Sequence, residues 1–238
     1  MKGAALVTGG ARRIGRALVL SLAERGHDIA LHYGNSEEDA QIVAEKIDNV
    51  GRKCHLFKSD FEKKEEVFAL IPAVFEIFPD CNLLINNASI FEHASLMETD
   101  EQLYDRHFNI NLKAPFFLSR DFARHCQEGQ IINILDSKIT QNVTDYFAYT
   151  LTKKVLLEFT RMAARELGPN IRVNGVCPGR ILPPAGKDDV YLDQMSKALP
   201  LQRRGDLESI TSAVSFLTEQ RFITGEWIFV DGGEHLIS

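Results

Sequence analysis

The stretch Thr8-Gly9-Gly10-Ala11-Arg12-Arg13-Ile14-Gly15 decides the fold. It follows the apolar run Ala4–Thr8 and leads directly into Ile14–Arg25, a segment whose apolar residues recur on one helical face. Glycines between a strand and a helix let the backbone turn tightly, and the free N–H groups at the helix N-terminus attract phosphate. A G-x-G-x-x-G pattern is absent, so the turn is of another kind. We therefore expect a phosphate-binding turn at the start of an α/β sheet.

The rest of the chain repeats this alternation of short apolar runs and segments of helical periodicity. Such a pattern predicts a parallel sheet with right-handed crossovers. We expect an α/β fold, one domain over 1–238, with a doubly wound, Rossmann-like parallel sheet of about seven strands and helices on both faces. The expected strands are Ala4–Thr8, Asp28–Tyr33, Lys53–Lys58, Asn82–Asn86, Gln130–Leu135, Ile171–Val176 and Trp227–Val230. The expected helices are Ile14–Arg25, Glu37–Val50, Lys63–Ile77, Glu101–Cys126, Phe147–Leu167 and Asp206–Thr218.

The least regular stretch is 180–204, which contains Pro183-Pro184 and Gly186 and a short helical piece around Tyr191–Ala198. It follows the carboxyl end of an expected strand, where ligands bind in open α/β sheets. Long loops in compact domains are usually functional. We interpret the stretch as a substrate lid, and a surface excursion without a role is the alternative.

Composition excludes several other classes of protein. The net charge of −6 argues against nucleic acid or an anionic membrane as a partner. The four cysteines are scattered, without C-x-x-C pairs or metal-like spacing to histidines, so neither a metal site nor a disulfide framework is expected. The apolar run Ala4–Val7 is too short for a signal peptide or a membrane span. We expect a cytoplasmic protein with a small-molecule substrate.

The two arginines of the turn point to a particular dinucleotide. Guanidinium groups beside a pyrophosphate suit an additional phosphate. The second expected strand ends His32-Tyr33-Gly34-Asn35-Ser36, without the carboxylate that would bind a free ribose 2′-hydroxyl. Asn35 and Ser36 can instead donate hydrogen bonds to a 2′-phosphate. With Arg12 and Arg13 they predict NADP (NADPH) as the cofactor, against the alternative that both arginines form a solvated surface.

Asp136, Tyr149 and Lys153 form the expected catalytic group. Tyr149 and Lys153 are four residues apart near the start of an expected helix, so their side chains point the same way. Asp136 closes the strand Gln130–Leu135 at the edge where ligands bind. A phenol is a poor acid at neutral pH, and a nearby ammonium favours the phenolate. We therefore expect Lys153 to lower the pKa of Tyr149 and prepare it for proton transfer.

Taken in order, these features resemble the short-chain dehydrogenase/reductase family over essentially the whole chain. The further matching residues are Asn86-Asn87-Ala88, Asn111, Pro178-Gly179 and Asp231-Gly232-Gly233. The resemblance implies that Tyr149 is the general acid and that Lys153 also binds the nicotinamide ribose. It implies that Asn111 holds a proton-relay water, that Asn86–Ala88 lines the adenosine side and that Asp60 contacts the adenine. It also implies a homotetramer, with Glu101–Cys126 and Phe147–Leu167 pairing between subunits.

Two departures from the common pattern resemble one branch of the family, the pteridine reductases. Arg13 stands at a motif glycine, and Asp136 replaces the catalytic serine thirteen residues before the tyrosine. Ser137 is adjacent but one residue out of register. His32-Tyr33 and Asn87-Ala88-Ser89-Ile90-Phe91 match the same branch, as do Pro200-Leu201 and Arg203. By this resemblance Phe91 stacks on a pterin and Ser89 contacts pterin and cofactor, whereas Phe91 as a packing residue and Asp136 as a turn cap remain open.

The sequence thus predicts an NADPH-dependent reductase of a dihydropterin or dihydrofolate-like substrate. The alternatives are an NADPH-dependent reductase of a 3-oxoacyl thioester or ketone, and a non-catalytic dinucleotide sensor, which would not need a tuned phenol. The expected catalytic residues are Asp136, Tyr149, Lys153 and Asn111. The expected cofactor-binding residues are Gly9, Arg12, Arg13, Ile14, Gly15, His32, Tyr33, Asn35, Ser36, Asp60, Phe61, Asn87, Ala88, Ser89, Tyr149, Lys153, Pro178, Gly179 and Ile181. The expected substrate-binding residues are Ser89, Phe91, Asp136, Tyr149 and Arg180.

Overall fold

The computed structural model describes residues 2–184 and 186–237. Its centre is a parallel sheet of seven strands in the order β3-β2-β1-β4-β5-β6-β7. Strand order reverses between β1 and β4, which gives the sheet the doubly wound topology predicted from the sequence. The strands are β1 (Ala5–Val7), β2 (Ile29–Tyr33), β3 (Cys54–Lys58), β4 (Leu83–Asn86), β5 (Gly129–Ile134), β6 (Ile171–Pro178) and β7 (Trp227–Val230).

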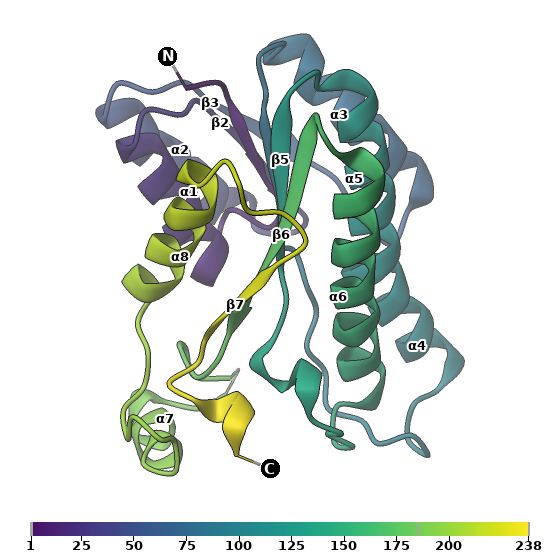
Figure 1. Cartoon of the computed structure of the whole chain (residues 1–238), viewed down its shortest axis with the longest axis vertical. Coiled ribbons are helices and arrows are strands. Elements are labelled where there is room, and N and C mark those ends of the chain that lie inside the picture. The colour runs from purple at the N-terminus through teal and green to yellow at the C-terminus, as the bar shows by residue number, and fades with distance from the viewer. Residues whose placement is uncertain (1, 185, 238) are drawn as a thin grey trace.

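Helices cover both faces of this sheet (Figure 1). One face carries α1 (Arg13–Glu24), α2 (Glu37–Asn49) and α8 (Leu207–Glu219). The other carries α3 (Lys64–Ile77), α4 (Glu101–Phe108), α5 (Ala114–His125) and α6 (Phe147–Leu167). The strands β1, β2 and β4 are buried along their whole length, because helices exclude water from both sides. Within the described residues, no helix is both long and apolar enough to span a membrane.

The helix expected over Glu101–Cys126 is divided, and its prediction as one helix was wrong. A π-helical segment, Asn109–Lys113, separates α4 from α5. Within it the Asn111 side chain accepts a hydrogen bond from the Ile90 N–H at 2.9 Å and donates one to the Ile90 carbonyl at 3.0 Å. A π-bulge adds a residue to the helical turn and commonly occurs at functional sites. The Asn111 amide therefore holds the backbone of the loop that follows β4.

The predicted lid follows β6 and lies beyond the carboxyl ends of the strands, where Figure 1 shows α7 (Asp189–Ser196) close to the C-terminal segment. Residue 185, within the predicted lid, lies outside the described residues. Asp188 begins α7 by accepting a hydrogen bond from the Tyr191 N–H at 2.9 Å, an N-cap contact. The topology thus brings the loops after β1, β2, β4, β5 and β6 to one edge, beneath the lid.

Candidate active site

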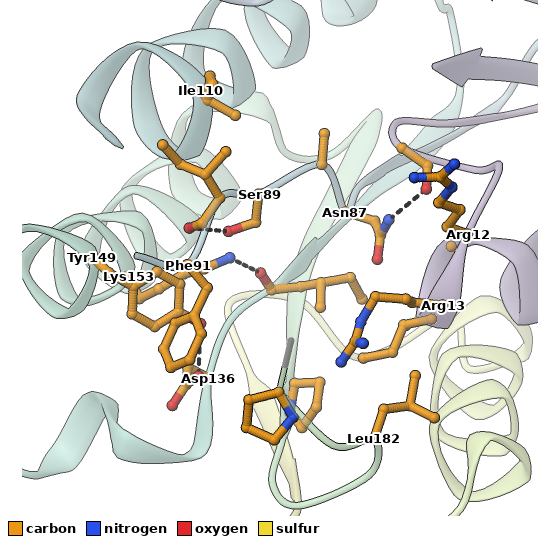
Figure 2. A pocket seen from close by; sticks show the side chains of 18 of the residues that line it. Arg12, Arg13, Asn87, Ser89, Phe91, Ile110, Asp136, Tyr149, Lys153 and Leu182 are labelled. Atoms are coloured by element: carbon orange, nitrogen blue, oxygen red, sulfur yellow. Dashed lines mark hydrogen bonds between the residues drawn. The ribbon is translucent and has the colours of Figure 1, made fainter. Parts of the chain in front are cut away.

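A cavity of 780 Å³ runs along this edge of the sheet. Figure 2 shows Arg12 and Arg13 toward one end, and Phe91, Asp136, Tyr149 and Lys153 toward the other. The residues of the expected cofactor-binding and substrate-binding sets all line the cavity. Asn86, expected to line the adenosine side with Asn87 and Ala88, does not, because it is 2% exposed and its amide donates to Asn133 Oδ1 at 2.8 Å. Among the predicted catalytic residues, Asn111 is the exception within the described chain, because its amide is turned to the Ile90 backbone. The cavity therefore joins the end where phosphate is expected to bind to a chemically distinct end.

The glycine turn lies in the middle of the cavity wall. Gly9 has a φ of +65°, a conformation that L-residues with side chains rarely adopt. A Cβ on Gly15 would lie 2.0 Å from the Gly9 carbonyl oxygen, so the first turn of α1 can pack here only without a side chain. Both glycines let backbone approach backbone and leave the N-terminus of α1 facing the cavity. An anionic pyrophosphate fits this arrangement because the helix terminus presents free N–H groups.

His32 holds the turn in place from the end of β2. Its Nδ1 accepts a hydrogen bond from the Gly9 N–H at 3.0 Å, so the proton is on Nε2, which donates to the Ser59 carbonyl at 2.9 Å. The ring also stacks on Phe61, with centroids 4.2 Å apart. Burial lowers the pKa of His32 to about 4, which keeps the imidazole neutral near pH 7. His32 therefore links the ends of β1, β2 and β3 as an uncharged support.

The two arginines of the turn have different surroundings. Arg12 forms an ion pair with Asp39 in the first turn of α2, which places it beside Asn35 and Ser36. Ser36 is the N-cap residue of α2 but forms no side-chain capping hydrogen bond with a described residue. Arg13 instead reaches the lid, where its Nη2 donates to the Pro183 carbonyl at 3.0 Å.

Arg13 occupies an unusual backbone conformation as well. Its φ is +51°, in the left-handed region that favours glycine. A residue with a side chain there costs roughly 1–2 kcal/mol. Such strain is found at functional sites, where surrounding contacts hold it. The hydrogen bond to Pro183 is one such contact, and it connects the glycine turn to the lid.

At the other end of the cavity, Asp136, Tyr149 and Lys153 come together as predicted. The Tyr149 hydroxyl donates to Asp136 Oδ2 at 2.7 Å, and the Lys138 N–H donates to Asp136 Oδ1 at 2.7 Å. Lys153 is 3% exposed, and its Nζ donates to the Ile134 carbonyl at 2.8 Å. The two hydrogen bonds to Asp136 fix the direction of its carboxylate. The Tyr149 hydroxyl and the Asp136 carboxylate are thus in direct contact, and the Lys153 ammonium group is fixed at the end of the same strand, β5.

The expected effect of Lys153 on Tyr149 was wrong. Burial, followed by the neighbouring Asp136 carboxylate, raises the pKa of Tyr149 well above that of a free phenol. Burial also raises the pKa of Asp136, although its hydrogen bonds with Tyr149 and Lys138 oppose this. Burial lowers the pKa of Lys153 to about 8, against the attraction of Asp136. Tyr149 is therefore a neutral phenol near pH 7.

An aromatic cluster forms the wall next to this group. Phe91 stacks on Tyr146, with ring centroids 4.0 Å apart and planes at 8°, and meets Tyr149 edge to face at 4.7 Å. Phe91 is nevertheless 47% exposed where it lines the cavity. Ser89, on the same loop, donates to the Ile90 carbonyl at 3.3 Å. Tyr146 thus supports one face of the Phe91 ring while the residue remains open to a ligand.

Sequence reasoning missed several residues of this end of the cavity, including Tyr146, Lys138, Tyr191, Met195 and Glu234. Two of them follow a detectable signal. Tyr146 lies three residues before Tyr149, directly before the expected helix Phe147–Leu167. Glu234 comes directly after Asp231-Gly232-Gly233. The lid residues Tyr191 and Met195 carry no comparable signal in the sequence, because their position in the cavity wall depends on how the lid packs against the rest of the chain.

A family model described as Enoyl-(Acyl carrier protein) reductase matches residues 9–235. The chain belongs to the short-chain dehydrogenase/reductase family. Its relatives in this family include the 3-oxoacyl-[acyl-carrier-protein] reductase FabG of Staphylococcus epidermidis. That relative is 34% identical over 245 residues, which cover 99% of this chain and 100% of the relative. A short-chain type dehydrogenase/reductase of Picea abies is 31% identical and covers 97% of this chain and 91% of its own length.

Solved structures of the family superpose closely on this chain. One is FolM Alternative dihydrofolate reductase 1 from Brucella canis complexed with NADP, with a TM-score of 0.92 and 37% identity, covering 99% of this chain and 95% of its own. Another is a blue fluorescent protein from a metagenomic library in complex with NADPH, with a TM-score of 0.90 and 32% identity, covering 97% of each chain. This short-chain dehydrogenase/reductase is an NADP-dependent oxidoreductase.

The residues present fit that cofactor. The glycine turn and the N-terminus of α1 would hold the pyrophosphate, and Arg12, Asn35 and Ser36, which line the cavity beyond β2, would hold the adenosine ribose with its 2′-phosphate. Lys153 lies at the opposite end of the same cavity and would hold the nicotinamide ribose. When bound, NADPH supplies hydride. The chain itself supplies the cradle, the cationic groups and the proton.

The position of Arg12 gives a test of cofactor preference. We expect Arg12→Ala to weaken NADPH binding by about 10- to 100-fold, because a charge-assisted hydrogen bond contributes about 1.5–3 kcal/mol. NADH, which lacks the 2′-phosphate, should lose little affinity. Arg25→Ala is the matched control, since Arg25 forms an ion pair with Glu219 and lies outside the cavity lining. Fluorescence titration of both cofactors measures the ratio, and an unchanged ratio in Arg12→Ala would contradict this assignment.

Proposed function

We propose that this NADP-dependent reductase acts on a pteridine, either a dihydropterin or a dihydrofolate-like substrate. The observation that carries the proposal is the Asp136 carboxylate, held by Tyr149 and by the Lys138 N–H. An ionised carboxylate only accepts hydrogen bonds. It suits a substrate edge that carries N–H donors, as a pterin does. A ketone or thioester oxygen is itself an acceptor and gains nothing from this partner.

The same geometry supports the chemistry of reducing a ring C=N bond. Hydride is delivered to the ring carbon, and the ring nitrogen takes up one proton. Tyr149 carries that proton on a neutral hydroxyl, and its hydrogen bond to Asp136 orients it. After transfer the phenolate is stabilised by Lys153, whose Nζ lies 5.7 Å from the centroid of the Tyr149 ring. Water oriented by Asp136 is the other proton source that this arrangement allows.

The stack of Phe91 on Tyr146 supports a flat aromatic substrate. We expect Phe91→Ala to raise KM for a dihydropterin at least several-fold, because stacking adds about 0.5–1.5 kcal/mol beyond buried area. NADPH affinity should change far less. Phe216→Ala is the control, since Phe216 is 46% exposed on α8, outside the cavity lining. Steady-state kinetics and cofactor titration separate the two effects, and equal losses for both ligands would make Phe91 a packing residue.

The lowered pKa of Lys153 predicts how activity depends on pH. Below about pH 8 the ammonium predominates, and as the pH rises through that value it loses its proton. We expect kcat/KM to fall on the alkaline side with a midpoint near 8. Lys153→Arg keeps its charge throughout this range, so its profile should lack that fall even if its activity is lower. A fall that persists unchanged in Lys153→Arg would show that another group titrates.

Reduction of a 3-oxoacyl thioester is the second candidate, because FabG of Staphylococcus epidermidis is 34% identical to this chain. The site offers it less support. Ser137, the hydroxyl nearest the position of the replaced serine, is 2% exposed and donates to Glu234 Oε2 at 3.0 Å. It is thus directed at a carboxylate rather than at a substrate oxygen. NADPH oxidation measured side by side with dihydropterins, dihydrofolate and an acetoacetyl thioester decides between the candidates.

We also propose that the protein assembles as a homotetramer. Large apolar side chains remain exposed on α5 and α6, among them Phe116, Val155 and Met162, which is 71% exposed. Clustered apolar surface of this kind marks interaction sites. The exposed face supports association through the two helices that the family resemblance pairs between subunits.

A further inference from the structure

The C-terminal segment places a buried carboxylate in the wall of the substrate end of the cavity. Glu234 is 4% exposed and lines the cavity. Its Oε1 accepts a hydrogen bond from Arg180 Nε at 2.9 Å, and its Oε2 accepts one from the Ser137 hydroxyl at 3.0 Å. A buried carboxylate requires such partners, because its desolvation is costly. Glu234 therefore connects the loops that follow β5 and β6.

The backbone around Glu234 is fixed independently of its side chain. The Asp231 carboxylate accepts hydrogen bonds from the N–H groups of Gly233 at 2.9 Å and His235 at 2.7 Å. Gln141 Nε2 donates to the carbonyls of Glu234 at 3.0 Å and Ile237 at 2.6 Å. The segment that carries Glu234 is thus anchored on two sides. Its carboxylate is a rigid reference point for the side chains that contact it.

Arg180 extends this connection to the lid. Its Nη1 donates to the Met195 carbonyl at 2.6 Å, near the C-terminal end of α7. The Arg180 side chain is 21% exposed and that of Glu234 is 5% exposed, so the pair is largely shielded from solvent. The Arg180 guanidinium therefore connects Glu234, in the C-terminal segment, to the lid helix α7.

We propose that Glu234 is a positioning residue that fixes Arg180 against the lid, so that α7 closes the substrate end of the cavity. Glu234 acts through Arg180, which faces the substrate, and has no part in proton transfer. Because the Arg180 guanidinium contacts Glu234 and the lid helix, and not the phosphate turn, the contribution falls on substrate affinity more than on cofactor affinity. This role extends beyond the choice of substrate, because it concerns how the lid is held whichever compound is reduced.

A double-mutant cycle tests the proposal in the full-length protein. Glu234→Ala and Arg180→Ala should each raise KM for the reduced substrate by about 10- to 100-fold, the order of loss that misplacement by 1 Å causes. NADPH affinity should change far less than KM in both variants, and NADPH binding also shows that the variants fold. The double variant should be no worse than Arg180→Ala, because Glu234 acts through that side chain. Multiplied losses in the double variant, or a parallel loss of NADPH affinity, would overturn the proposal.

Two further variants separate positioning from mere support of the C-terminus. Gln141→Ala removes one of the two backbone anchors of the C-terminal segment but leaves Asp231 and the Glu234 carboxylate in place, so KM should rise less than in Glu234→Ala. Glu234→Gln retains an oxygen that accepts from Arg180 and should recover much of the loss. If Gln141→Ala is as damaging as Glu234→Ala, the segment acts only as a support and the positioning role fails.

Trypsin provides a readout that needs no substrate. Lys187 and Lys197 flank α7, so cleavage at these two residues reports how firmly the lid is held. Glu234→Ala and Arg180→Ala should be cut faster there than the unsubstituted protein, as mass spectrometry of the NADPH-bound forms would show. Equal cleavage rates would contradict the proposal. If no pteridine is reduced, the proposed function fails, while proteolysis still decides the role of Glu234.

Discussion

Replacing Asp136 by alanine is expected to lower kcat by about 10²–10⁴-fold, the contribution of a positioned acid or base. In the structure the Asp136 carboxylate lines the cavity and accepts a hydrogen bond from the Tyr149 hydroxyl at 2.7 Å. Its removal leaves the Tyr149 hydroxyl without this partner and removes the proposed hydrogen-bond acceptor for the substrate. NADPH affinity should stay the same, because the phosphate turn lies at the other end of the cavity. Stopped-flow single turnovers with a dihydropterin and cofactor titration measure the two effects separately.

Asp136→Ser distinguishes the candidate substrates more sharply than Asp136→Ala. A hydroxyl at this position donates to a carbonyl oxygen, which a carboxylate does not do. A pteridine reductase should lose pterin turnover in this variant and gain reduction of ketones or thioesters, whereas a 3-oxoacyl reductase should become faster on its own substrate. Asp145→Ala is the control, because the Asp145 carboxylate is exposed and lies just before α6, the helix that carries Tyr149. Unchanged pterin turnover in Asp136→Ser would reduce Asp136 to a turn residue and leave Phe91 as the main support for a pterin.

The inner strands β1, β2 and β4 could be predicted from the sequence because they are buried on both faces. Such strands are continuous apolar runs, which differ clearly from the amphipathic helices between them. Ile29–Tyr33 accordingly lies within an expected strand. The edge strand Trp227–Val230 is only half-buried, but it too is a continuous apolar run and lies where a strand was expected. Parallel topology then fixes which strand ends meet, and for that reason Asp136 and Tyr149 could be placed together before any distance was known.

What could not be predicted depends on contacts between distant segments. The break at Asn109–Lys113 exists because the Asn111 amide bonds to Ile90, which lies 21 residues earlier. Arg13 turns to the lid because Pro183 offers a carbonyl 170 residues away. Neither contact changes the local periodicity of the sequence. One continuous helix was therefore expected over Glu101–Cys126, and both Arg12 and Arg13 were expected at the 2′-phosphate.

The direction of the Tyr149 pKa is a different kind of error. From the sequence, the ammonium of Lys153 was the charge expected next to the phenol. In the structure burial dominates, and the Asp136 carboxylate is the charged group that the hydroxyl contacts. Both disfavour the phenolate. The spacing of four residues therefore identified Tyr149 and Lys153 as neighbours. It could not show whether desolvation or the nearby charge determines the pKa of Tyr149.

Tyr149→Phe should lower kcat for the reduced substrate by about 10²–10⁴-fold, because it removes the proton that a neutral phenol holds for transfer. The ring remains, so the edge-to-face contact with Phe91 and the packing of the cavity wall persist. KM and NADPH affinity should therefore change little, and the loss should appear in the chemical step. Single-turnover rates under saturating NADPH measure that step directly.

Tyr146→Phe is the matched control for this substitution. Tyr146 lies three residues earlier and stacks on Phe91 at 4.0 Å, so the variant also loses one hydroxyl from the same aromatic cluster. Its rate should fall far less, because Asp136 receives its side-chain hydroxyl hydrogen bond from Tyr149. If Tyr149→Phe keeps nearly full turnover while Asp136→Ala does not, the proton comes from water oriented by Asp136. In that case Tyr149 serves to hold the carboxylate in place, and the general acid of this site is not the phenol.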